Sequence, residues 1–260
     1  MILLSCLREI TWYRIYFVNI LELIFTLLFY MFIRDEIKNY TVTKPLPAGL
    51  IKKAEEYKAL AILKHSFPDR FARMHKDESP DLQDSDGDLG VEVTSGESTS
   101  DHIITSESIK YRHSKSEVEK EKILKKIQNN GGNIDGYIID YPIGNADSDM
   151  IHVTAAFEKK IAKADLYRKR FKCIGLAIML DCPLFINHQW GKRLSHINNG
   201  KYDFVALLHW SGVVLYDFRT DNYSYANINR EDMDALKKLG RMAAEGIIKD
   251  DDSVWNCIPE

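Results

Sequence analysis

The sequence lacks the short motifs of several common enzyme classes. It has no G-x-S-x-G nucleophile elbow, no H-E-x-x-H zinc motif, no phosphate-binding loop and no dinucleotide-binding glycine fingerprint. Its four cysteines are scattered without C-x-x-C spacing, which argues against a zinc site and favours a reduced, cytosolic setting. The sequence therefore gives no support for a serine hydrolase of the nucleophile-elbow type, a zinc protease of this motif, a phosphate-loop nucleotide triphosphatase or a Rossmann-type dehydrogenase.

An excess of basic residues is also missing. The formal net charge is -3, from 35 basic and 38 acidic residues. Contact with nucleic acid would therefore need a local basic patch. Residues 159–172 offer one, because they include several lysines and arginines and only one acid, Asp165. Such a patch can hold phosphates, although it is also what a solvated helix face looks like.

The length and composition suit one globular domain with extensions. The chain has 260 residues, of which 45% are hydrophobic and 28% charged. We expect a hydrophobic N-terminal segment at residues 1–40, a linker with two prolines at residues 41–49, and a folded domain at residues 50–250.

Residues 15–33 form a hydrophobic run whose only formal charge is Glu22. This run is close to the ~20 residues that cross a bilayer, so it predicts an anchor in the inner membrane with the domain on the cytoplasmic side. A secretory signal is a second interpretation, although no small-residue cleavage site follows the run. A third is an upstream extension from a misassigned start codon, with Met31 as the true start. Basic residues on both sides leave the orientation open.

Apolar spacing along the rest of the chain predicts alternating helices and strands. Helices are expected at residues 50–65, 114–128, 153–171 and 230–246. Strands are expected at residues 137–140, 174–180, 204–209 and 213–218, with residues 71–74 as the only candidate for a further early strand. Residues 95–111 are rich in Ser and Thr without an apolar period, and are expected to form a loop.

The strongest chemical signal is an acid-bearing hairpin at residues 79–94. Asp81 stands at the start of one expected strand, and Glu92 lies between Val91 and Val93 in the next. A lone buried carboxylate is costly, and a divalent cation shared with Asp81 would satisfy both acids. Mg²⁺ takes oxygen ligands, often one or two carboxylates with water and substrate phosphate. The hairpin therefore predicts half of a metal-dependent phosphodiesterase site.

Pro80-Asp81, followed by Glu92-Val93-Thr94, resembles the motif of the PD-(D/E)XK nuclease superfamily. The resemblance implies an α/β fold with a restriction-endonuclease-like core, in which a central mixed sheet is flanked by helices. It also implies Mg²⁺ or Mn²⁺ held by Asp81, Glu92 and the backbone carbonyl of Val93, with DNA or RNA as the substrate.

The motif of this family ends in a lysine, and Thr94 stands at that position here. The lysine usually orients or activates the attacking water, whereas Thr94 can at most donate a hydrogen bond to it. Some members carry a replacement lysine on the following core helix. At 100° per residue, Lys160 falls at the edge of the apolar stripe of the expected helix, with Lys163 next and Lys159 facing away. Lys160 is therefore the first candidate and Lys163 the second, unless all three are solvated.

Three other features remain open. In the family, an acid on the first helix sometimes extends the metal site; Glu56 is the candidate, with Glu55 equally available by spacing. The segment Thr94-Ser95-Gly96 offers hydroxyls after the acid, but no histidine is obviously paired with them. Residues 188–193, which include Trp190, are interpreted as a surface loop that can contact substrate.

Together these features predict a metal-dependent nuclease with Asp81, Glu92 and Lys160 in its active site. The alternative is a nuclease-like fold that lost catalysis with the motif lysine and works as a binding or assembly module, tethered to a membrane by residues 15–33. Metal binding would distinguish the two.

Overall fold

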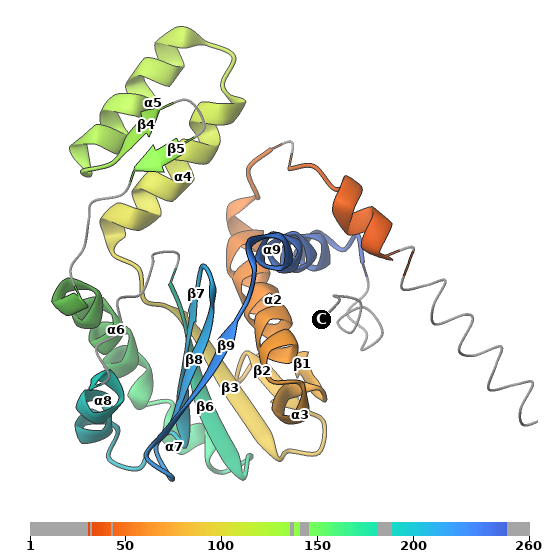
Figure 1. The fold of residues 1–260 in the computed structure, drawn as a ribbon, viewed down its shortest axis with the longest axis vertical. Coiled ribbons are helices and arrows are strands. Elements are labelled where there is room, and N and C mark those ends of the chain that lie inside the picture. The colour runs from red at the N-terminus through yellow and green to blue at the C-terminus, as the bar shows by residue number, and fades with distance from the viewer. Residues whose placement is uncertain are drawn as a thin grey trace, which may run out of the picture.

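The computed structural model describes residues 31, 33–42, 44–135, 138–140, 146–180 and 189–248. It confirms an α/β fold, in which a seven-stranded mixed sheet is flanked by helices (Figure 1). Nearly all of the hydrophobic run at residues 15–33 lies outside the described residues, as does His188. Across the described ranges, no helix has both the length and the apolar character that a membrane crossing requires.

The main sheet has the strand order β1-β2-β3-β6-β7-β8-β9. The first three strands form an antiparallel meander, β3, β6 and β7 run parallel, and the last three are again antiparallel. A separate hairpin pairs β4 with β5. The strands are β1 Met74–Lys76, β2 Leu82–Asp84, β3 Leu89–Ser95, β4 Asn133–Asp135, β5 Ile138–Asp140, β6 Cys173–Met179, β7 Phe204–His209, β8 Gly212–Asp217 and β9 Asn222–Asn227.

Helices cover both faces of this sheet. In Figure 1, α2 and α9 lie on one side of the sheet and α6 and α8 on the other, while α4 and α5 stand apart with the small hairpin. The helices are α2 Ala48–Ser66, α3 Pro68–Phe71, α4 Thr99–His113, α5 Glu117–Asn129, α6 Ala146–Ile161, α7 Ala164–Tyr167, α8 Trp190–Asn198 and α9 Arg230–Glu245.

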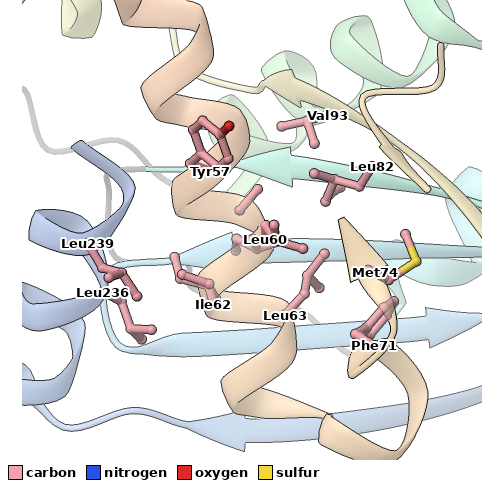
Figure 2. Packing of buried hydrophobic residues seen from close by; sticks show 14 of the residues in the cluster. Tyr57, Leu60, Ile62, Leu63, Phe71, Met74, Leu82, Val93, Leu236 and Leu239 are labelled. Atoms are coloured by element: carbon pink, nitrogen blue, oxygen red, sulfur yellow. The ribbon is translucent and has the colours of Figure 1, made fainter. Parts of the chain in front are cut away.

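Side chains of β3 alternate between two hydrophobic cores, as the two-residue period of a strand requires. Val91 and Val93 belong to the core beneath α2 and α9, where Leu60 of α2 is fully buried (Figure 2). The opposite core contains Leu176 of β6, which pairs with Glu92. Glu92 therefore points from β3 toward α6 and α7, into the second layer of the fold.

One glycine fixes how closely the two covering helices of the first core approach. A methyl group added at Gly240 of α9 would lie 2.7 Å from the backbone nitrogen of Lys58 of α2. Because the obstacle is backbone, it cannot rotate away. Gly240 therefore allows a helix contact that any larger residue would push apart.

The described end of the predicted N-terminal segment packs on the domain. Ile33 and Ile37 are buried in the core beneath α2 and α9. The hydroxyl of Tyr40 donates to Oε2 of Glu245 at 2.7 Å, which ties the segment to α9. The boundaries at residues 40 and 50 remain predictions.

Several local predictions are wrong, each for a physical reason. Residues 95–111 form most of helix α4, which shows little apolar period because only Ile104 among its apolar residues is fully buried. The expected helix at 153–171 is two helices, α6 and α7. Trp190 begins helix α8 and does not lie in a loop. Strand β9 was missed because it is an exposed polar edge.

Candidate functional site

The two acids of the hairpin lie on neighbouring segments: Asp81 immediately precedes β2, and Glu92 is within β3. Leu82 pairs with Val91, so one further step of the register places Asp81 opposite Glu92. Asp81 is 5% exposed and Glu92 is 1% exposed. Buried carboxylates need charged or hydrogen-bonding partners, and both acids have them.

Glu92 receives three donors from the layer formed by α6 and α7. The ammonium of Lys160 lies 2.6 Å from Oε1 of Glu92, and the ammonium of Lys163 lies 2.7 Å from the same oxygen. The hydroxyl of Tyr167 donates to Oε2. Lys160 comes from the last turn of α6, Lys163 from the turn that separates α6 from α7, and Tyr167 from the end of α7. The break between the two helices therefore faces Glu92 with two positive charges.

The two lysines differ in their surroundings. The side chain of Lys160 is 15% exposed, whereas that of Lys163 is 50% exposed. Lys159 lies on the exposed face of α6. A buried ammonium is held in one geometry, while an exposed one exchanges easily with water. Lys160 is therefore the fixed partner of Glu92.

Asp81 is held from the backbone of β3 and from α2. The backbone N–H of Val93 donates to Oδ2 of Asp81 at 2.8 Å. The ammonium of Lys52, on α2, lies 3.3 Å from Oδ1. The acid pair of Asp81 and Glu92 is thus contacted by cations from both sides of the sheet.

Burial and the charges of both acids raise the pKa of two tyrosines, Tyr167 and Tyr202. Burial, followed by the hydrogen bond to Glu92, raises the pKa of Tyr167, and the charge of Asp81 raises it further. Burial also raises the pKa of Tyr202, as do the charges of Glu92 and Asp81. Both phenols therefore stay protonated at neutral pH, and Tyr167 remains a hydrogen-bond donor to Glu92.

Glu56 lies beside Asp81 and shares a lysine with it. Lys52 contacts Oε1 of Glu56 at 3.0 Å, and Lys76 of β1 contacts Oε2 at 3.0 Å. Burial acts to raise the pKa of Glu56, but the hydrogen bonds from Lys52 and Lys76 outweigh it, so the pKa is lowered. Glu56 is therefore a charged, buried acid next to the pair, whereas Glu55 pairs with Lys58.

The lowered pKa of Glu56 predicts a pH-dependent contribution to stability. A depressed carboxyl pKa stabilises the fold above the unfolded value, near 4.5, and this stabilisation is lost as the pH falls through the folded pKa. Glu56→Gln should lower the free energy of unfolding at pH 7 by about 1.5–3 kcal/mol. The deficit should begin to shrink below about pH 4.5, where the unfolded wild-type chain binds a proton at Glu56, and should disappear as the pH falls through the lowered pKa of the folded state.

Denaturant unfolding from pH 3 to pH 7 measures this effect. Glu55→Gln is the control, because Glu55 is partly exposed and its ion pair contributes little. A Glu56→Gln deficit that stays constant over the whole range would show that the charge of Glu56 is not what stabilises the fold.

Val93 and Thr94 are the two residues that follow Glu92 on β3. Val93 is buried, and its N–H orients Asp81. Thr94 is partly exposed and follows Glu92 by two residues, which places it on the same face of β3. This is also the face on which Lys160 contacts Glu92.

The chemistry of the acid pair fits a hard divalent cation. Both side chains offer carboxylate oxygens, the ligands that Mg²⁺ and Mn²⁺ prefer. Among the described residues, no group of three or more histidine, cysteine, aspartate or glutamate side chains is placed to hold a metal ion. A cation at this site would rest on Asp81 and Glu92, and it would compete with Lys160 and Lys163 for one oxygen of Glu92.

Sequence reasoning missed two partners of the acids. Lys52 precedes Glu56 by four residues on α2, a spacing that predicts an ion pair on a helix. The sequence did not single out Tyr167 as a partner of Glu92, because nothing in its spacing distinguishes it from a core residue. Comparison of the chain with family models, curated proteins and solved structures gives no match.

Proposed function

We propose that the protein is a metal-dependent nuclease that cleaves DNA or RNA. The observation that carries this proposal is the contact between Lys160 and Glu92. The motif position of the lysine holds Thr94, yet an ammonium from α6 lies 2.6 Å from the motif acid. This ion pair supports Lys160 as the replacement for the missing motif lysine.

The order of elements supports a restriction-endonuclease-like core. Helix α2 is followed by the meander β1-β2-β3, then by α6 and by β6, which runs parallel to β3. This is the sequence of one helix, three strands, one helix and one strand that the resemblance implies. The early strand expected at residues 71–74 lies instead at Met74–Lys76, because Phe71 ends helix α3, and this strand β1 is the first of the meander. The elements α4, α5, β4 and β5 are then an insertion between β3 and α6.

Each residue of the site has a role in this proposal. When bound, Mg²⁺ would polarise the scissile phosphate and lower the pKa of a water. Asp81 and Glu92 would hold the cation, with the N–H of Val93 fixing the carboxylate of Asp81. Lys160 would orient the water and balance negative charge that develops on the phosphate. Tyr167 keeps Glu92 in place, and Thr94 offers a further hydroxyl.

A binding or assembly module is the second candidate, and one observation favours it. The two ammonium groups on Glu92 together carry the charge that a divalent cation would bring. An ion cluster of this kind can hold a fold together without any metal. The acid pair would then be a structural relic of an active site.

Cleavage of labelled DNA and RNA by the purified protein distinguishes the candidates. The nuclease proposal predicts cleavage that requires Mg²⁺ or Mn²⁺ and stops with a chelator. Thermal unfolding with and without the metal gives an independent readout, because a cation that binds the folded state raises the melting temperature. Absence of both effects would favour the binding module.

A further inference from the structure

A second polar cluster lies where β3 ends and the insertion begins. Its members are Ser95, the last residue of β3, Glu97 in the following turn, and His102 on α4. The Oγ of Ser95 lies 2.9 Å from Nε2 of His102. The Nδ1 of the same ring lies 3.1 Å from Oε2 of Glu97. Hydroxyl, imidazole and carboxylate therefore form one continuous chain.

The hydrogen-bond roles in this chain fix the position of each proton. The Glu97 side chain is 8% exposed, and an ionised carboxylate only accepts, so Nδ1 of His102 carries the ring proton. Nε2 is then an acceptor and faces the Ser95 hydroxyl. The backbone N–H of Glu97 donates to Oγ of Ser95 at 3.2 Å, which leaves the Ser95 proton for His102. The arrangement is that of a nucleophile, a general base and an orienting acid.

The cluster is accessible to solvent, and helix α4 does not depend on it for an N-terminal cap. The His102 side chain is 55% exposed, and Ser95 is exposed as well. Helix α4 is already capped by Ser98, whose side chain accepts the N–H of Asp101. Alternation along β3 turns Ser95 away from the face that carries Glu92. A substrate can therefore reach Ser95 without entering the acid pair.

We infer that Ser95, His102 and Glu97 form a second catalytic centre, which hydrolyses small carboxylic esters. An open site suits a small ester with a good leaving group, since the position of Ser95 is exposed. Ser95 would be the nucleophile and His102 the general base. Glu97 is a positioning residue, because it acts through the imidazole.

The reaction balances without any other reactant than water. Ser95 Oγ attacks the ester carbonyl carbon while its proton passes to Nε2 of His102. The bond to the alcohol oxygen breaks, and His102 returns the proton to the departing alkoxide, leaving acyl-Ser95. Water then attacks the acyl carbon and gives a proton to His102. The Ser95 oxygen leaves and regains that proton, so one ester and one water give one acid and one alcohol.

A fluorophosphonate probe, which reacts with activated serines, tests the centre on the full chain. We expect labelling of Ser95, located by mass spectrometry of the peptide, and turnover of p-nitrophenyl acetate. Ser95→Ala should abolish both signals. His102→Gln should slow labelling by ~100-fold or more, the usual contribution of a general base. Glu97→Gln should slow it to a similar extent, and Glu97→Asp, which keeps the carboxylate, should restore part of the rate.

Controls separate this centre from the fold and from the proposed nuclease. Ser106→Ala removes an exposed hydroxyl of α4 that binds only the carbonyl of Ile103 among the described contacts, and should label like the wild type. Asp81→Asn should also label normally. Circular dichroism confirms that each variant is folded. The inference is overturned if the wild type leaves Ser95 unlabelled, or if folded His102→Gln is labelled as fast as the wild type.

Discussion

Asp81→Asn should reduce Mg²⁺-dependent cleavage of nucleic acid by ~100-fold or more while leaving the fold intact. The amide oxygen of asparagine can still accept the N–H of Val93, which in the wild type donates to Oδ2 of Asp81 at 2.8 Å. The substitution thus keeps the hydrogen bond and removes the negative charge that a cation needs. Cleavage rates at saturating Mg²⁺, compared with thermal unfolding curves, measure the two effects separately.

Asp81→Ala is a less informative change at the same position. It leaves the buried N–H of Val93 without its acceptor, which costs about 1–3 kcal/mol of stability. The matched control is Asp86→Asn, because Asp86 lies in the exposed turn of the same hairpin and its carboxylate forms a solvent-exposed ion pair with Arg73. Asp86→Asn should cleave like the wild type. If Asp81→Asn does so too, Asp81 holds no catalytic metal.

The local pattern of the sequence was enough to predict that Asp81 and Glu92 lie opposite each other across a hairpin. Asp81 and Glu92 are separated by one short turn, so the pairing of two adjacent strands places them opposite each other whatever the rest of the chain does. The apolar residues around Glu92 predicted a buried strand. An isolated acid in a buried strand needs a partner, so Glu92 became a candidate site residue. The helical period likewise placed Lys160 at the edge of an apolar stripe.

Contacts between distant segments could not be read in the same way. Tyr167 reaches Glu92 only because α6 ends at Ile161 and the chain turns before α7, whereas a continuous helix was expected. The pairing of Ser95 with His102 was missed for a related reason. Residues 95–111 looked like a loop, and only a helix that starts at Thr99 brings the imidazole back onto the end of β3. The first contact depended on where a helix ends, and the second on whether a segment is a helix at all.

Substitution of the lysines around Glu92 should distinguish an active nuclease from a fold that has lost catalysis. Lys160→Ala should lower cleavage by ~100-fold or more, because it removes the fixed cation beside the motif acid. Its effect on stability should be small, since Lys163 and Tyr167 still contact Glu92. Lys163→Ala should retain most of the activity and bind Mg²⁺ more tightly, because a competitor for Oε1 is gone. Lys159→Ala is the silent control.

The double variant Lys160→Ala/Lys163→Ala gives the sharpest contrast. Among the contacts of the described residues, it leaves the buried Glu92 with the Tyr167 hydroxyl alone when no metal is bound, and an uncompensated buried charge costs about 3–5 kcal/mol. In a metal site, Mg²⁺ replaces the two lost charges, so millimolar Mg²⁺ should recover much of the melting temperature although cleavage stays low. In a structural ion cluster with no room for a cation, Mg²⁺ should recover nothing. That second result would favour the binding module, because the lysines would then be the only cations that Glu92 accepts.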